Sequence, residues 1–397
     1  MNLSFGRDYL AIPGPSVSPE RVLNAMHTSA PNIYEGALVD MVADMVPDLK
    51  AVARTEGHVA IYIANGHGAW EAASMNVLAP GDTALVLDTG RFAGIWGTVC
   101  ERLGIKTQVI DFGKKTGVIP DQVEAALRAD TEHKIKAVLT VQTDTATGIR
   151  NDIPKLREAM DAAEHPALLM VDCIASLACD VYEMDAWGVD VTVAASQKGL
   201  MTPPGLGFVF LNDKARAAQN PNVSYYWDWR PRIEPERFYQ FFGGTAPTHH
   251  LLGLRAALDL IAEEGGIEVV WKRHAVLART AWAAFEAWGQ GGPMEINVAD
   301  PALRSHAVTA LSLGAHDGSR LRRWVQDNGG LTLGIGLGMS APGDPNGDGF
   351  FRLGHMGHIN AHMMLGALGV IESGLKALDI PHGDGALSAA AEVIARA

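Results

Sequence analysis

Lys198 has the sequence setting that best suits covalent chemistry. It follows an apolar, β-branched run of strand length, Val189–Ala195, and precedes Met201–Gly205, whose two consecutive prolines can continue neither a helix nor a sheet ladder. We therefore expect Lys198 on a rigid turn at the end of a buried strand. Burial lowers the proton affinity of a lysine, and the free amine is a nucleophile toward carbonyl groups. Most single lysines are surface-loop charges, so a second feature is needed to support this interpretation.

Asp172 supplies that second feature. It ends another short apolar run, Ala167–Asp172, upstream of Lys198. In open α/β sheets, ligands bind outside the carboxyl ends of the strands. Two successive strands would therefore present Asp172 and Lys198 to one crevice. An aspartate that pairs with a pyridinium nitrogen and a lysine that forms a Schiff base are the protein's part of pyridoxal phosphate chemistry.

Three further features could bind parts of a ligand, although each has a plainer interpretation. The turn 65–68 leads into a predicted helix whose exposed backbone N–H groups would favour an anion, but such turns are common. The hydroxyl-rich segment 142–148 suits a polar ligand or simply caps a helix. Arg352 lies in an otherwise apolar run, and a guanidinium group can hold a carboxylate through two parallel hydrogen bonds.

The elements that must position these side chains follow an alternating pattern. Strand-length apolar runs alternate with helix-length periodic stretches from residue 59 to residue 211, which predicts a mostly parallel sheet covered by helices. Residues 251–289 have helical periodicity, and short strands are predicted at 308–313 and 330–335. A chain of 397 residues is expected to form two domains.

Two stretches closely resemble the class V (fold type I) pyridoxal-phosphate aminotransferases, and within them the alanine–glyoxylate and serine–glyoxylate branch. These stretches are Val171-Asp-Cys-Ile-Ala-Ser176 and Ala195-Ser-Gln-Lys-Gly-Leu-Met-Thr-Pro-Pro-Gly205. The resemblance implies an α/β fold with a mostly parallel seven-stranded sheet in a large domain and a smaller α+β C-terminal domain. It also implies an N-terminal arm at 1–20 that lines the site, a large cofactor-binding domain at 21–265 and a small domain at 266–397.

The resemblance also implies the cofactor, pyridoxal 5′-phosphate, and a set of site residues. Lys198 and Asp172 would be catalytic, and Arg352 and Gly14 would bind the substrate. The cofactor-binding residues would be Gly66, His67, Trp96, Thr145, Asp172, Gln197, Lys198 and Thr245. Among these, the backbone of Gly66 and His67 would hold the phosphate together with Gln197, Trp96 would cover the ring, and Thr145 would contact its phenolic oxygen.

A homodimer is implied by Thr245. In the resembled family, the matching residue reaches the phosphate bound by the partner subunit, which places the site at a subunit interface. Phe242 stands near a position where many relatives carry a tyrosine, so it cannot supply that hydroxyl group.

Composition excludes several other classes of function. A net charge of −13 argues against nucleic-acid binding and against a basic membrane-surface patch. No uncharged apolar run reaches the roughly 18 residues of a membrane helix, and no signal peptide is expected. Three cysteines without a C-x-x-C motif favour a reducing compartment, so we expect a cytoplasmic protein. The histidines show no H-E-x-x-H motif, and no metal site is expected.

The predicted function is transfer of an amino group from a small amino acid, serine or alanine, to a 2-oxo acid, with glyoxylate implied by the resemblance. Another class V enzyme remains an alternative: a transaminase with a different donor, such as aspartate or an aminophosphonate, a lyase, or a desulfurase. Cys173 and Cys179 lie just after a predicted buried strand, which disfavours a desulfurase. A non-catalytic cofactor-binding protein and a nicotinamide dehydrogenase are more distant alternatives, the latter weakened by the missing G-x-G-x-x-G fingerprint.

Overall fold

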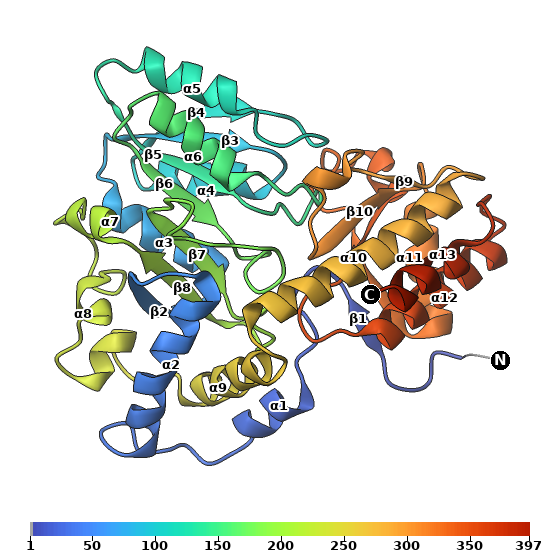
Figure 1. Cartoon of the computed structure of the whole chain (residues 1–397), viewed down its shortest axis with the longest axis horizontal. Coiled ribbons are helices and arrows are strands. Elements are labelled where there is room, and N and C mark those ends of the chain that lie inside the picture. Colours follow the sequence, from blue (N-terminus) through green and yellow to red (C-terminus); the bar gives the residue numbers. More distant parts are fainter. Residues whose placement is uncertain (1–2) are drawn as a thin grey trace.

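A seven-stranded sheet forms the centre of the larger part of the molecule (Figure 1). The computed structural model describes residues 3–397. Neighbouring strands are parallel except for β8, which runs antiparallel to both β2 and β7. The predicted mostly parallel seven-stranded sheet is therefore confirmed. Across the sheet the strands are β2 (His58–Ala64), β8 (Gly205–Leu211), β7 (Val191–Ala195), β6 (Leu168–Asp172), β5 (Ile135–Val141), β3 (Thr83–Asp88) and β4 (Lys106–Asp111).

Helices cover both faces of this sheet. Because both faces are buried, the central strands β6 and β7 are apolar and small along almost their whole length. One face packs on α3 (Gly66–Val77) and α4 (Phe92–Arg102). The other face packs on α2 (Ala37–Ala53), α5 (Pro120–Ala129), α6 (Ile153–Ala162) and α9 (Thr248–Glu263). The short helices α1 (Glu20–Met26), α7 (Asp213–Ala217) and α8 (Arg230–Ile233) lie in the connections.

A five-stranded sheet and its helices form a second, smaller core. The order is β1 (Tyr9–Ala11), β11 (Leu331–Ile335), β12 (Phe350–Gly354), β10 (Val308–Ser312) and β9 (Glu295–Ile296). Its core includes residues of α10 (Ile267–Gly289), α11 (Asp317–Gly329), α12 (Ala361–Ala377) and α13 (Ala386–Ala395). Figure 1 shows α10 running from the larger unit along the smaller one. The domain limits at residues 20 and 265 stay predictions.

The N-terminal segment connects the two units. Its strand β1 pairs with β11 of the smaller sheet, and the chain then passes over the carboxyl edge of the larger sheet. Within residues 3–397, no helix combines the length and the apolar character that a membrane crossing requires.

Candidate active site

A cavity of about 240 Å³ opens at the carboxyl ends of β5, β6 and β7, where the sequence predicts the site. Six of the predicted residues line it: Gly66, His67, Thr145, Asp172, Gln197 and Lys198. The remaining lining residues are Asn65, Trp70, Phe92, Thr143, Ile174 and Ala175. The structure thus brings residues from five separate loops to one place.

Asp172 is a buried carboxylate at the end of β6, held by two N–H donors. Its Oδ2 accepts the indole N–H of Trp70 at 2.9 Å, and its Oδ1 accepts the backbone N–H of Ile174 at 2.6 Å. Burial raises the pKa of Asp172 to about 7, although these hydrogen bonds oppose the shift. A cation beside it would favour its ionised form, so Asp172 suits the protonated nitrogen of a pyridine ring.

Lys198 lies on the turn that follows β7 and points into the same cavity. Its amine donates to the carbonyl of Pro13, and it forms no ion pair within residues 3–397. Burial lowers the pKa of Lys198 to about 8; the nearby Arg352 adds to this shift, whereas Asp172 opposes it. About a tenth of the amine is therefore unprotonated at pH 7, far more than for an ordinary lysine, and only the free amine attacks a carbonyl.

The N-terminal segment holds Lys198 from the side of the smaller unit. Ser16 donates its hydroxyl to the backbone carbonyl of Lys198 at 2.7 Å and its N–H to the carbonyl of Gln197 at 2.9 Å. Gly14 has a φ of +103°, and a Cβ there would lie 2.2 Å from the amine of Lys198. A glycine is therefore required both by the backbone and by the approach of the lysine. The substrate contact predicted for Gly14 stays a prediction, but its place beside the reactive amine is compatible with it.

The start of α3 forms the opposite end of the cavity. The side chain of Asn65 caps this helix by accepting the N–H groups of His67 and Gly68 at 3.1 and 3.3 Å. A Cβ on Gly66 would lie 2.3 Å from the end of the Ile174 side chain, so a larger residue would push Ile174 from its place in the cavity wall. A helix N-terminus favours an anion. The buried Oε1 of Gln197 also has no hydrogen-bond partner, which marks a polar side chain not yet satisfied by the protein.

Arg352 reaches this region from β12 of the smaller sheet. Its Nε donates to the carbonyl of Ile335 at 2.6 Å and its Nη1 to the carbonyl of Thr145 at 2.5 Å. Burial lowers the pKa of Arg352 to about 10, with the charge of Asp144 opposing the shift. Within residues 3–397, Arg352 forms no ion pair, and its Nη2 makes no hydrogen bond. A buried cation with free donors suits a carboxylate ligand.

The prediction that Trp96 covers a bound ring disagrees with the structure. Trp96 is fully buried behind the cavity wall, where it donates to Ser74 at 3.0 Å and stacks on Trp70 with ring centroids 6.1 Å apart. Phe92, one turn earlier on α4, lines the cavity instead. Residues four apart share one helix face, so the residue implied by the resemblance lies on the same face of α4 as Phe92, one turn further along the helix. Phe92 is therefore the aromatic residue placed to contact a ring.

The sequence did not predict Trp70 as a site residue, and Thr245, which it did predict, lies outside the cavity. Nothing in the sequence interpretation singled out Trp70, although its position four residues after Gly66 puts it on the same face of α3. Thr245 is exposed and does not line the cavity. Its predicted contact is with a partner subunit, so that contact stays a prediction. Phe242 is fully buried and packs on Phe238, with ring centroids 5.4 Å apart.

Comparison with known families assigns this site. The sequence profile of the family described as "Aminotransferase class-V" matches residues 9–342. The chain belongs to this family. The predicted resemblance is confirmed, and the protein is a pyridoxal-phosphate-dependent transaminase of fold type I.

Individual relatives of this class V aminotransferase cover most of its length. The serine–glyoxylate aminotransferase of Methylorubrum extorquens is 36% identical over 93% of this chain and 91% of its own. The L-aspartate–glyoxylate aminotransferase of Paracoccus denitrificans is 32% identical over 93% of this chain and 91% of its own. Among solved structures, pyridoxamine–pyruvate aminotransferase from Mesorhizobium loti superposes with a TM-score of 0.86 at 23% identity, covering 100% of both chains.

The residues of the cavity fit pyridoxal phosphate. The start of α3 suits its phosphate group, and Asp172 suits its ring nitrogen. Gln197 also lines the cavity and could donate to the phosphate through its amide N–H groups, whereas its unpartnered Oε1 is an acceptor. Phe92 provides an aromatic wall, and Lys198 provides an amine for its aldehyde.

Proposed function

We propose that the protein transfers the amino group of a small amino acid, serine or alanine, to a 2-oxo acid, with glyoxylate as the acceptor. The carrying observation is that Lys198, with a lowered pKa, lies close enough to feel the charges of both the buried carboxylate of Asp172 and the guanidinium of Arg352, which forms no ion pair within residues 3–397. Relatives whose names specify glyoxylate as a substrate support this acceptor.

Each side chain has a defined part in this proposal. Bound pyridoxal phosphate supplies an electron sink for the carbanion at the substrate Cα. Lys198 would hold the cofactor through its aldehyde and, as a free amine, would be the nearest base to move a proton at the substrate Cα. Asp172 keeps the ring nitrogen protonated. Arg352 holds the substrate carboxylate through its free donors, which fixes the direction of the Cα–H bond relative to the ring.

The remaining cofactor contacts are part of the same proposal. Gly66, His67 and Gln197 would bind the phosphate, and Thr145 would donate to the phenolic oxygen of the ring. Burial and the charge of Arg91 lower the pKa of His67, which favours its neutral form at pH 7. His67 would therefore add no positive charge, and its backbone N–H would have to exchange the side chain of Asn65 for the phosphate.

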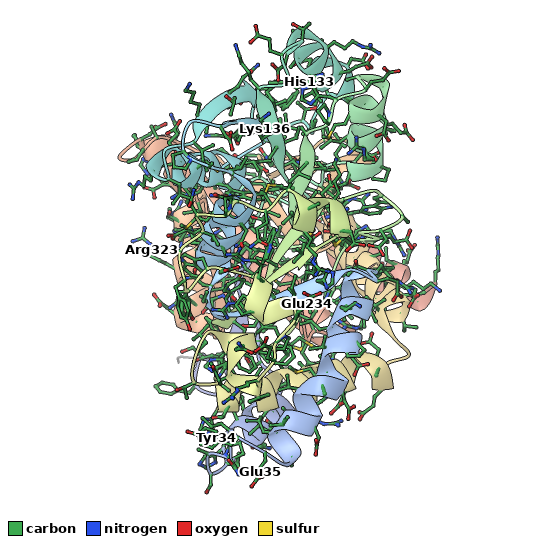
Figure 2. The ribbon with its side chains drawn as sticks, turned by 90° about the vertical axis from the view of Figure 1, so that its left-hand side faces the viewer. Tyr34, Glu35, His133, Lys136, Glu234 and Arg323 are labelled. Carbon is green, nitrogen blue, oxygen red and sulfur yellow. The ribbon has the colours of Figure 1, made fainter. Side chains whose placement is uncertain are left out.

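We also propose a homodimer in which Thr245 of each subunit contacts the phosphate bound by the other. Thr245 lies on the exposed segment before α9, outside its own cavity. Two large aromatic side chains are exposed. Tyr225, which precedes Thr245 in the sequence, is 83% exposed, and Tyr34, at one end of the molecule, is 84% exposed. Figure 2 shows Tyr34 and Glu35 projecting from the connection between α1 and α2, far from His133 and Lys136. A subunit interface would cover such side chains.

A cytoplasmic location completes the proposal. Cys100, Cys173 and Cys179 are all buried free thiols, which is the usual state of cysteines in a reducing compartment. Their burial also argues against the desulfurase alternative, because burial raises the pKa of Cys179 to about 12 and that of Cys100 to about 11. A catalytic thiol must reach the substrate as a thiolate, and these thiols are neither accessible nor acidic.

The visible absorption of the purified holoenzyme tests the substrate assignment. Serine, alanine and aspartate are added one at a time, and the decay of the cofactor band and the oxo acid formed are measured. We expect serine or alanine to convert the cofactor and glyoxylate to restore it. Conversion by aspartate alone would move the donor to that amino acid, as the name of the Paracoccus relative suggests. Release of ammonia without an acceptor would favour the lyase alternative.

A further inference from the structure

Asp144 is a buried carboxylate beside the active site that the proposed reaction does not use. It lies between Thr143 and Thr145, both of which line the cavity, and it is 0% exposed. Within residues 3–397 it forms no ion pair. A buried carboxylate without an ion pair must be stabilised by hydrogen bonds, so its donors indicate its role.

One oxygen of Asp144 holds the start of α4. Its Oδ2 accepts the backbone N–H groups of Arg91 and Phe92, both at 2.8 Å. Arg91, which precedes the helix, provides no side-chain cap of its own. The first N–H groups of a helix lack partners within it and favour a negative charge. Asp144 therefore caps α4 at the residue, Phe92, that forms the aromatic wall of the cavity.

The other oxygen of Asp144 holds the loop that contacts Arg352. Its Oδ1 accepts the N–H of Ala146 at 2.8 Å and that of Thr147 at 3.4 Å. Between these residues and Asp144 is Thr145, whose carbonyl accepts the Nη1 of Arg352. The negative charge of Asp144 also raises the pKa of Arg352 against the effect of burial.

The packing around Asp144 leaves little freedom for its carboxylate. A Cβ on Gly90 would lie 2.5 Å from the carboxylate carbon of Asp144 and 2.7 Å from both oxygens. The absence of a side chain at Gly90 is thus what allows the carboxylate to reach α4. One buried group therefore links the aromatic wall on α4 to the arginine on β12.

We propose that Asp144 is a positioning residue, and this role rests on the proposed function. Asp144 fixes Phe92 against the cofactor ring and holds the Thr145 carbonyl against Arg352. It touches neither cofactor nor substrate. Its effect on the cofactor passes through Phe92, and its effect on the substrate passes through Arg352.

The near-isosteric variant Asp144→Asn tests the proposal. An amide has a single acceptor oxygen, so one of the two pairs of N–H groups loses its partner. We expect cofactor affinity, measured by fluorescence titration of the full chain stripped of cofactor, to fall about tenfold or more. The visible circular dichroism of the bound cofactor should weaken because the ring is held less firmly, and the KM for the oxo acid should rise. Asp190 is a buried carboxylate at the amino end of β7, away from the cavity. Asp190→Asn should therefore leave the cofactor affinity, the circular dichroism and the KM unchanged.

A double-mutant cycle with Phe92→Leu separates positioning from general loss of stability. If Asp144 acts through Phe92, Asp144→Asn should change cofactor affinity by less than about threefold in the Phe92→Leu background. Gly90→Ala places a methyl group against the carboxylate of Asp144, so it should have the same effects as Asp144→Asn. It serves as the test if Asp144→Asn does not fold. Unchanged affinity and circular dichroism in these variants would overturn the proposal, as would a full loss that persists without Phe92. A wild-type protein that binds no cofactor would instead overturn the proposed function.

Discussion

A buried aspartate lies near a lysine at both the amino and the carboxyl ends of the central strands of the seven-stranded sheet. The two aspartates differ in the hydrogen bonds and ion pairs that the protein provides for them. At the amino end of β7, Asp190 accepts the N–H of Leu169 at 2.8 Å, the amide of Asn212 at 2.9 Å and the ammonium of Lys214 at 3.2 Å. At the carboxyl ends, Asp172 and Lys198 form no ion pair with any residue from 3 to 397, and Arg352 forms none either.

This difference separates a structural carboxylate from a functional one. Hydrogen bonds and an ion pair within the protein use both oxygens of Asp190, so this carboxylate stabilises the fold and has no part in binding a ligand. Asp172, Lys198 and Arg352 are left without ionic partners, and burial shifts the pKa values of all three toward the neutral form. A cofactor with a phosphate group, a basic ring nitrogen and an aldehyde, together with a substrate carboxylate, would satisfy each of them.

The largest expected effect is that of Lys198→Ala. We expect turnover to fall by about a thousandfold or more, because both the anchor for the cofactor and the nearest base are lost. Lys214→Ala, at the opposite edge, should retain activity within about twofold, since Lys214 is 47% exposed and touches no part of the cavity. Steady-state assays with serine and glyoxylate measure both. A Lys198→Ala enzyme that keeps a tenth of the wild-type rate would refute the assignment.

Asp172→Asn should have the next largest effect. Without a carboxylate, the ring nitrogen is no longer held protonated, and we expect a barrier higher by about 3 kcal/mol, or roughly a hundredfold in kcat. Asp190→Asn should instead leave kcat near wild type and lower the free energy of unfolding by about 2 kcal/mol, because one buried N–H or the Lys214 ammonium loses its acceptor. If both variants lose activity to the same extent, the distinction between a functional Asp172 and a structural Asp190 is wrong.

Arg352→Lys should mainly weaken substrate binding. Lysine keeps a positive charge but cannot present two parallel donors while also contacting the carbonyls of Ile335 and Thr145. We expect the KM for the oxo acid to rise about tenfold with a smaller change in kcat. An unchanged KM, measured at saturating amino donor, would remove Arg352 from the substrate site.

The last expected effect is on folding and does not concern turnover: it is the pH dependence of stability of the cofactor-free protein. The pKa of Asp172 is raised in the folded state to about 7, so the folded state binds more protons than the unfolded state above pH 4, and stability falls as pH rises toward 7. His274 and His355, whose pKa values burial lowers to about 3 and about 4, act in the opposite direction below pH 6.5. The difference in unfolding free energy between wild type and Asp172→Asn isolates Asp172, and it should change by about 3.5 kcal/mol between pH 4 and pH 7.5, because each of about three pH units contributes about 1.4 kcal/mol. A constant difference across this range would show that Asp172 is not perturbed.

The sequence predicts the buried part of the fold well because the central strands of a parallel sheet are continuous apolar runs. Runs 136–141 and 167–172 became β5 and β6 almost residue for residue. The edge strand β4 was not predicted, since its residues Lys106–Asp111 are largely exposed and lack an apolar run. Strand β1 is too short to show any periodicity and exists because β11 offers it a partner.

The site was predicted where backbone position alone determines it. Asp172 and Lys198 come directly after strands, so the topology brings them together whatever the details of packing. The aromatic wall depends on which turn of α4 reaches the sheet edge, and that depends on where the helix begins. Asp144 sets this start from a different loop, so no local pattern around Phe92 or Trp96 could distinguish the two residues.

The N-terminal segment has a consequence for how the enzyme is made. Strand β1 at Tyr9–Ala11 pairs with β11 at Leu331–Leu333, so the whole larger sheet lies between the two partners in the sequence. On the ribosome, the residues that cover Lys198 emerge before that sheet but cannot pair until β11 has been made. The larger sheet can therefore form while its lysine is still uncovered. A chain released before β11 is made would expose a reactive amine without a formed substrate pocket.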